Sequence, residues 1–297
     1  MLTGLHFLVT YACNFECDHC FLHCGPRAKG TFTSQQLADV LGQAVGAGTI
    51  KGVSFEGGEP MLYYPLVLDA VGRAGRLGLK TDIVTNAYWA TSQADAEIWL
   101  GPLAAAGLAT LTISDDCLHY GERHGEHASR VEAAGKTLGV AVSVIRRQRP
   151  GVAPAADGSS ASLAAGGVKF RGRAADKLTE GLPRRKWEDL NRCPHEDLRN
   201  PGRVHVDCHG NLQLCQGLCM GNCFAAPLAQ VIREYDADAH PIAGPLARGG
   251  PAELARAHGL PHEEAYVDEC HLCYRLRQAL SDRFAQYLAP RQAYGRE

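Results

Sequence analysis

The sequence lacks a strong excess of either charge. Its 297 residues include 30 Lys and Arg against 32 Asp and Glu, so the formal net charge is -2. This balance argues against a nucleic-acid-binding face or a polybasic membrane patch as the main function. No apolar run is long enough to cross a bilayer, and the apolar stretch 2–12 lacks the basic leader of a signal peptide. We therefore expect a cytoplasmic protein that binds neither nucleic acid nor membrane.

Several common catalytic signatures are also missing. No phosphate-binding P-loop, dinucleotide-binding glycine fingerprint or Ser-His-Asp arrangement can be read from the sequence. Cysteine, in contrast, is abundant, with 12 residues. In a small secreted chain this number would suggest disulfides, but here the chain is long and the cysteines are spaced like metal ligands. Reduced thiolates that hold metal are the better interpretation.

The first half of the chain alternates short β-branched runs with longer helical patterns. Such alternation predicts an α/β fold whose parallel sheet is linked by helical crossovers, open or curled toward a barrel. The predicted strands are 5–10, 52–55, 80–84, 110–113, 140–145 and 168–170, and the predicted helices are 34–47, 65–75, 92–105 and 121–138. A segment rich in Pro, Ala, Gly and Ser, 150–167, is expected to be a flexible loop before the sixth strand.

The pattern changes after residue 180. A glycine-punctuated hairpin is predicted over 203–215, and a last helix over 271–287. We therefore expect two domains, a core over 1–180 and a small cysteine-rich α+β extension over 181–297.

Three cysteines, Cys13, Cys17 and Cys20, follow the first predicted strand with the spacing C-x3-C-x2-C. On a [4Fe–4S] cluster, three thiolates leave one iron open to an exogenous chelating ligand. The alternative is a structural zinc site on Cys17, Cys20, Cys24 and either His19 or His23.

Polar residues follow the next strands as well. The second strand runs into Gly57-Gly58-Glu59-Pro60, where glycines permit a close backbone approach to a ligand and Glu59 offers an acceptor for a cationic amine. An ordinary tight turn is the alternative. The third strand ends at Asn86 and the fourth at Ser114, at the rim where barrel-like α/β folds bind ligands. Asp115 and Asp116 would orient a substrate or cap the following helix.

The cysteine loop and the Gly-Gly-Glu-Pro turn together resemble the radical S-adenosylmethionine superfamily. The resemblance implies a partial (β/α)6 TIM-like barrel with a [4Fe–4S] cluster on Cys13, Cys17 and Cys20, whose free iron binds S-adenosylmethionine. Reductive cleavage of this cofactor would give a 5′-deoxyadenosyl radical that abstracts hydrogen from a substrate. Cofactor-binding residues would be Gly57, Gly58, Glu59, Pro60, Asn86 and Ser114. Two positions depart from the family: His19 replaces an aromatic residue and Ala87 a glycine.

The C-terminal cysteines resemble the Twitch and SPASM extensions of some radical S-adenosylmethionine barrels. This resemblance implies an auxiliary [4Fe–4S] cluster, and our predicted ligands are Cys193, Cys215, Cys270 and Cys273. The last two open the predicted final helix, whose N-terminus favours thiolates. The roles of Cys208, Cys219 and Cys223 stay open, as does a second auxiliary cluster. A zinc ribbon is the alternative.

The resemblance implies an oxidoreductase-like enzyme that performs a net oxidation, or modifies a peptide or natural product, with help from the auxiliary cluster. The substrate would be a small molecule or a peptide, and the electron donor a flavodoxin or ferredoxin. One alternative is a radical epimerase with Cys117 as the catalytic hydrogen donor, although this thiol equally suits a buried small hydrophobic residue. Another is a non-catalytic iron–sulfur or zinc-binding protein. We expect Arg171 and Arg173 to lie on a solvated surface.

Overall fold

A computed structural model describes residues 1–154 and 162–296. Its main sheet has eight strands in the order β11-β10-β9-β1-β2-β3-β4-β5. Six of them run parallel: β9 (Arg203–Asp207), β1 (Gly4–Thr10), β2 (Gly52–Gly57), β3 (Lys80–Thr85), β4 (Thr110–Ser114) and β5 (Ala141–Ile145). The α/β class and the parallel sheet are therefore confirmed.

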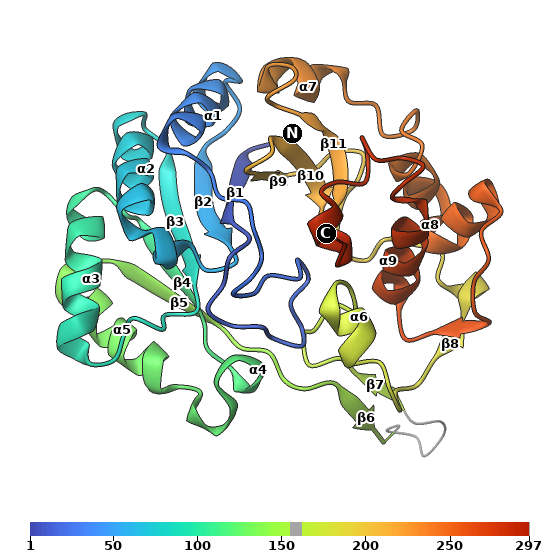
Figure 1. Ribbon diagram of the computed structural model, residues 1–297, viewed down its shortest axis with the longest axis horizontal. Helices are drawn as coiled ribbons and strands as arrows, with labels where there is room; N and C mark the ends of the chain where they lie inside the picture. Colours follow the sequence, from blue (N-terminus) through green and yellow to red (C-terminus); the bar gives the residue numbers. More distant parts are fainter. Residues whose placement is uncertain (155–161, 297) are drawn as a thin grey trace.

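Four helices cover the outer face of this curved sheet (Figure 1): α1 (Ser34–Gly46), α2 (Tyr64–Arg76), α3 (Gln93–Ala105) and α5 (Glu126–Leu138). Helix α1 shows why they form where they do. Thr33 caps its N-terminus in a reciprocal capping box with Gln36, and Gly48 follows its end at φ +73°. The apolar residues between them recur at helical spacing and are buried: Leu37, Val40, Leu41 and Ala44.

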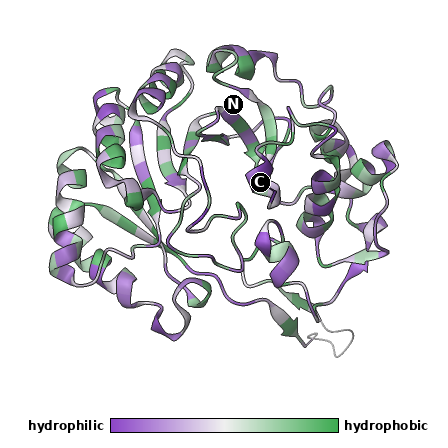
Figure 2. Cartoon of the chain, viewed as in Figure 1, coloured by the Kyte–Doolittle hydropathy of each residue, from purple (hydrophilic) through white to green (hydrophobic). Residues whose placement is uncertain are grey.

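Successive side chains of each strand point to opposite faces of the sheet. Hydrophobic and hydrophilic residues accordingly follow one another along the strands (Figure 2). In β1, Leu5 and Phe7 are fully buried in the main hydrophobic core, whereas His6 lies between them and lines a cavity inside the curve of the sheet. The sheet therefore separates an apolar outer layer, packed under helices, from a polar interior.

The predicted sixth strand at 168–170 is wrong, because no strand lies there in the described structure. Val168 and Phe170 are buried instead in a small separate core with Ala174, Leu178 and Val267. The sixth parallel strand is β9, which pairs with β1 at the opposite end of the row. A short apolar run needs burial, and packing without sheet hydrogen bonds is enough to provide it.

The segment predicted as a flexible loop contains two short strands. Its described ends form an antiparallel pair, β6 (Gly151–Ala153) and β7 (Ser162–Ala164), while 155–161 lie outside the described residues. The helix predicted over 121–138 begins only at Glu126. It is preceded by α4 (Cys117–Tyr120) and by a 3-10 turn at Gly121–Arg123.

The predicted hairpin is confirmed, and it joins the main sheet. Strand β9 turns into β10 (Asn211–Cys215), which pairs with β11 (Leu218–Asn222), so this part of the chain continues the sheet of the N-terminal half. The remaining elements are α6 (Arg173–Lys177), β8 (Arg185–Lys186), α7 (Leu228–Glu234), α8 (Ala243–His258), β12 (Ala265–Tyr266) and α9 (Glu269–Leu280). Helix α9 ends seven residues before the predicted boundary. Among the described residues, no helix combines the length and apolarity needed to span a membrane.

Candidate functional site

The loop after β1 crosses the interior of the molecule between the strand ends and α6 (Figure 1). There it lines a cavity of about 470 Å³ together with residues from β2, β3 and β4. The predicted site residues that share this cavity are Cys13, Cys17, Cys20, Gly57, Gly58, Asn86 and Ser114. They come together because the carboxyl ends of neighbouring parallel strands meet at one edge of the sheet.

Contacts with α6 hold the cysteine loop in place. The Arg173 guanidinium donates to the carbonyl oxygens of Cys17 (2.8 Å) and Cys24 (2.6 Å). At Gly172 a Cβ would lie 2.5 Å from the carbonyl oxygen of Cys20. The expectation that Arg173 is solvated surface is therefore wrong, and so is that for Arg171, which is buried.

Two of the three thiols, Cys13 and Cys17, lie in a setting that disfavours the free thiolate. Burial raises the pKa of Cys13 to about 11 and that of Cys17 to about 12. A hydrogen bond with Cys24 lowers the pKa of Cys20 to about 6 despite its burial. Because a metal binds the thiolate form, such buried thiols gain most from a metal that neutralises their charge.

The spacing of the sulfur atoms bears on the kind of metal. Among the described residues, ligand atoms from three side chains lie within 4.8 Å of one another at His6–Glu56–His205 and at His19–Asp116–His119, and the cysteines form no such group. A zinc ion with Zn–S bonds of about 2.3 Å would hold its sulfurs about 3.8 Å apart. The described geometry therefore does not favour the zinc site weighed as the alternative.

The two glycines of the turn after β2 make room for the cysteine loop. Gly57 has φ +135°, and a Cβ at Gly58 would lie 2.1 Å from the carbonyl oxygen of Ala12. The Gly58 amide donates to the Thr10 carbonyl at 2.7 Å. Both glycines also line the cavity. Because they have no side chains, the cysteine loop can approach their backbone closely, and the cavity beside them keeps its space.

Glu59 and Pro60 of the same turn do not line the cavity. The Glu59 carboxylate is fully buried and accepts hydrogen bonds from the Met61 amide, the Thr85 hydroxyl and the Asn86 amide at 2.7–2.9 Å. Burial raises the pKa of Glu59 to about 7, although these hydrogen bonds oppose the shift. In this arrangement Glu59 joins the end of β2 to the end of β3.

Asn86 connects the end of β3 to the cysteine loop, since its side-chain amide donates to Asn14 Oδ1 at 2.8 Å. The next residue, Ala87, has φ +59°, so the turn keeps the left-handed conformation that a glycine would adopt.

The acidic pair after β4 caps helices. Asp115 accepts hydrogen bonds from the amides of Gly125 and Ala128, and Asp116 from those of Leu118 and His119. The predicted capping role is therefore confirmed for Asp116, the N-cap of α4, which also lines the cavity, while Asp115 binds the amides at the start of α5.

Cys117 lies apart from the site. It is the first residue of α4, it is exposed, and it does not line the cavity. The interpretation of Cys117 as a buried hydrophobic residue is therefore wrong.

The four cysteines predicted to hold an auxiliary cluster line one small cavity: Cys193, Cys215, Cys270 and Cys273. Two buried arginines face them. Arg171 lies 2.6 Å from the Cys215 sulfur, and Arg277 lies 3.9 Å from the same atom. Burial raises the pKa of each of Cys193, Cys270 and Cys273. Cys208, Cys219 and Cys223 are buried elsewhere in the hairpin region.

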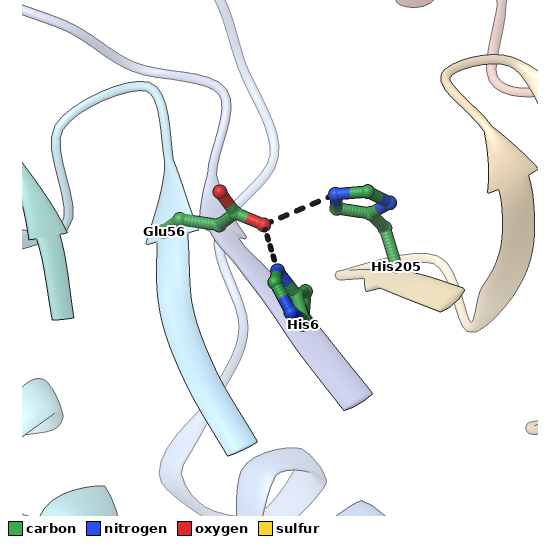
Figure 3. A group of neighbouring side chains, drawn as sticks. All are labelled: His6, Glu56 and His205. Atoms are coloured by element: carbon green, nitrogen blue, oxygen red, sulfur yellow. Dashed lines mark hydrogen bonds and ion pairs between the residues drawn. The ribbon is translucent and has the colours of Figure 1, made fainter. Parts of the chain in front are cut away.

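The sequence analysis did not predict a further polar group inside the barrel, formed by His6, Glu56 and His205. The Glu56 carboxylate lies between the rings of His6 and His205, with one oxygen 2.9 Å from His6 Nδ1 and 3.1 Å from His205 Nε2 (Figure 3). Burial alone would raise the pKa of Glu56, but the contacts with His205 and His6 hold it well below its ordinary value. An inward-facing polar residue within an apolar strand was the available signal.

A larger groove, of about 960 Å³, lies on the outer surface beside α2 and α3. Its lining is mostly Ala, Gly, Leu and Pro and holds none of the cysteines or histidines. The chemistry of the molecule therefore centres on the smaller interior cavity.

Comparisons with known proteins agree with this geometry. The family model of the radical SAM superfamily matches residues 7–121. A protein of Bacillus subtilis (strain 168), YydG, which is named for peptide biosynthesis, is 23% identical over 107 residues. That match covers 36% of this chain and 34% of YydG.

A solved structure, that of BtrN, shows the same fold. BtrN in complex with AdoMet and 2-DOIA superimposes with a TM-score of 0.51 at 18% identity, over 78% of this chain and 82% of BtrN. The structure of anSMEcpe with bound AdoMet matches 96% of this chain and 98% of its own, at a TM-score of 0.47 and 12% identity. The family model thus identifies residues 7–121 as similar to a radical SAM domain, and the likeness to BtrN concerns the fold. The matched residues include Cys13, Cys17 and Cys20, and the radical SAM family implies a [4Fe–4S] cluster and S-adenosylmethionine.

Proposed function

We propose that this enzyme uses Cys13, Cys17 and Cys20 to hold the cluster that cleaves S-adenosylmethionine, and that it oxidatively modifies a peptide. One observation carries the proposal. The three thiols share a cavity with Gly57, Gly58, Asn86 and Ser114, from the ends of three further strands.

The cofactor would bind across these strand ends. When bound, the cluster and S-adenosylmethionine would supply the chemistry that removes a hydrogen atom from an unactivated carbon. The chain contributes orientation. Asn86 ties the cysteine loop to β3, and Gly57 and Gly58 keep the turn after β2 close to the loop, so both walls of the pocket keep their positions relative to the thiols.

The charge of the cavity suits an anionic group. Basic residues outnumber acidic ones among the described residues that line it, with Arg147, Lys169, Arg171, Arg173 and Arg203 against Glu56, Asp82 and Asp116. This excess supports binding of a carboxylate, such as that of the amino-acid end of the cofactor or of a peptide substrate.

We further propose that Cys193, Cys215, Cys270 and Cys273 hold an auxiliary [4Fe–4S] cluster in a Twitch/SPASM-like extension. Such a cluster would supply electron transfer for a net oxidation. Four thiolates on one cluster carry a large negative charge in a buried place, and Arg171 and Arg277 lie where they would offset it. We expect the reductant to be a flavodoxin or ferredoxin.

The choice of a peptide substrate rests on the likeness to YydG, which is named for peptide biosynthesis. A small molecule is the second candidate, favoured by the fold shared with BtrN, whose structure contains 2-DOIA. Epimerisation with Cys117 as hydrogen donor is not favoured, because this thiol does not line the cavity.

The proposal is tested by replacing Cys13, Cys17 and Cys20 together with Ala. After anaerobic reconstitution, we expect the variant to form no 5′-deoxyadenosine with dithionite and S-adenosylmethionine, yet to retain the iron bound at the C-terminal cysteines. Cys117→Ser is the matched control and should cleave the cofactor like the wild type. Cofactor cleavage by the triple variant would refute the assignment.

A further inference from the structure

The His6–Glu56–His205 group goes beyond the radical chemistry proposed above. Its members come from three adjacent parallel strands, β1, β2 and β9. His205 is the register partner of His6, while Glu56 lies two residues beyond Ser54, the partner of His6 on the other side. Residues two apart on a strand face the same side, so all three side chains converge inside the barrel.

We propose that these three side chains form a binding site for a divalent first-row transition metal ion. Two imidazoles and one carboxylate are a recurrent facial ligand set for such ions and leave further coordination positions open. Ligands about 2.1 Å from a metal and at right angles to each other lie about 3.0 Å apart. The observed contacts of 2.9 Å and 3.1 Å have this spacing.

The position of the group favours a ligand-binding role over a purely structural one. Glu56 and His205 are largely buried, with side chains 15% and 6% exposed, and both line the interior cavity together with His6. Taking a carboxylate out of water costs free energy, and a metal ion bound to all three side chains would offset that cost.

The open side of the site faces the interior cavity, because all three residues line it. A metal ion there would present its free positions to whatever occupies the cavity. Oxygen donors, such as a hydroxyl, carboxylate or amide of a substrate, are suitable ligands for these positions. Asp82 on β3 also lines the cavity and is fixed by hydrogen bonds from Ser54 (2.7 Å) and Thr112 (3.0 Å).

A second cluster of similar composition, His19–Asp116–His119, differs in one respect. The Asp116 carboxylate already accepts hydrogen bonds on both oxygens, from the Leu118 and His119 amides on one and the Arg147 amide on the other. It serves as a helix cap, whereas Glu56 lies in the middle of a sheet with the two imidazoles against one of its oxygens. The second cluster therefore provides the control.

The test is a titration of the anaerobic holoprotein with Mn²⁺, followed by the six-line EPR signal of the free ion. We expect the wild type to bind one equivalent, with nitrogen couplings from two imidazoles in the pulsed EPR spectrum. Glu56→Gln and His205→Gln should weaken binding at least about tenfold. His119→Gln should bind as the wild type does.

If the variants at the more buried positions fail to fold, His6→Gln can be used in their place. The His6 side chain is 28% exposed, so this substitution should disturb the fold less. It should lose one of the two nitrogen couplings and about tenfold in affinity. A wild type that leaves the signal of millimolar Mn²⁺ unchanged would overturn the proposal, as would variants that bind like the wild type. Binding is measured without S-adenosylmethionine, so this outcome is independent of the test of cofactor cleavage.

Discussion

At the scale of single residues, the glycine pair after β2 shows how one feature serves two neighbours. The sequence predicts that Gly57 and Gly58 permit a close backbone approach. The structure identifies the partner of this approach as the first turn of the cysteine loop, in addition to the cavity. Sequence alone cannot identify it, because the loop and the turn are separated by more than forty residues and meet only when β1 and β2 pair.

Gly58→Ala should therefore damage the cluster site. A Cβ there would lie 2.1 Å from the Ala12 carbonyl oxygen, a backbone atom that moves only if the loop moves. We expect a loss of about 2–4 kcal/mol in the free energy of unfolding and a lower iron content at the first cluster. Urea unfolding and iron counting of the anaerobic holoprotein measure both.

Gly42→Ala is the control, since a Cβ at that position in α1 meets no atom within 4 Å. It should stabilise the protein by up to about 1 kcal/mol. Equal effects of the two substitutions would contradict the role assigned to Gly58.

Other residues could not be assigned from sequence because their partners are distant. Arg171 lies 44 positions from Cys215, and His205 lies about two hundred from His6. A lone arginine or histidine belongs to no local sequence pattern. The expectation for it is therefore the usual one for its residue type, which for arginine is a position on the surface. The cysteines differ, because several ligands stand close together and their spacing is visible.

At the scale of elements, periodicity determines what can be predicted. The first five strands and the helices α1, α2 and α3 agree with the sequence patterns to within about two residues, because each pattern extends over at least a turn or several alternations. The segment 168–170 has no measurable period, and its apolar side chains are buried without joining a sheet.

A buried histidine, His240, lies between α7 and α8 and provides a prediction on how stability depends on pH. His240 is buried, with Nε2 2.9 Å from the Cys219 carbonyl oxygen, while Nδ1 accepts from the amides of Ile242 and Ala243. The neutral ring fits this arrangement, and burial lowers the pKa of His240 below its ordinary value.

In the unfolded chain this imidazole takes up a proton near pH 6.5, whereas in the folded chain it does so only at lower pH. Its contribution to stability is therefore complete above about pH 6.5 and falls as the pH decreases, by up to about 1.4 kcal/mol per unit. We expect the urea midpoint to fall between pH 7.5 and 5.5, and the fall to be smaller in His240→Gln. An unchanged pH dependence in the variant would contradict the role of this side chain.

At the scale of the whole molecule, the two cysteine sets reach their positions in different ways. Cys13, Cys17 and Cys20 belong to one loop, so local sequence is enough to group them. The second set extends over eighty residues, and the fold brings Cys215, at the end of β10, to the same cavity as Cys270 and Cys273 in the first turns of α9. The sequence indicated these four only through a resemblance, because no local rule links residues so far apart.

This arrangement predicts that the two sets can be separated by mutation. Replacing Cys270 and Cys273 with Ala should remove half of the cluster iron. The iron at Cys13, Cys17 and Cys20 should remain, because no cysteine lines both cavities. We expect 5′-deoxyadenosine still to form from S-adenosylmethionine and dithionite, but the modified substrate to be lost. Iron analysis, sulfide analysis and chromatography of both products measure these effects.

Cys223→Ala is the matched control, since Cys223 is a buried cysteine of the hairpin region outside the four-cysteine cavity. It should leave the iron content and both products close to those of the wild type. If Cys223→Ala lost iron while the Cys270 and Cys273 variant kept it, the auxiliary ligands would have to be sought among Cys208, Cys219 and Cys223. Arg171 would then keep Glu196, 4.0 Å away, as its anionic partner, whereas Arg277 would need another one, because a buried cation is stable only where negative charge balances it.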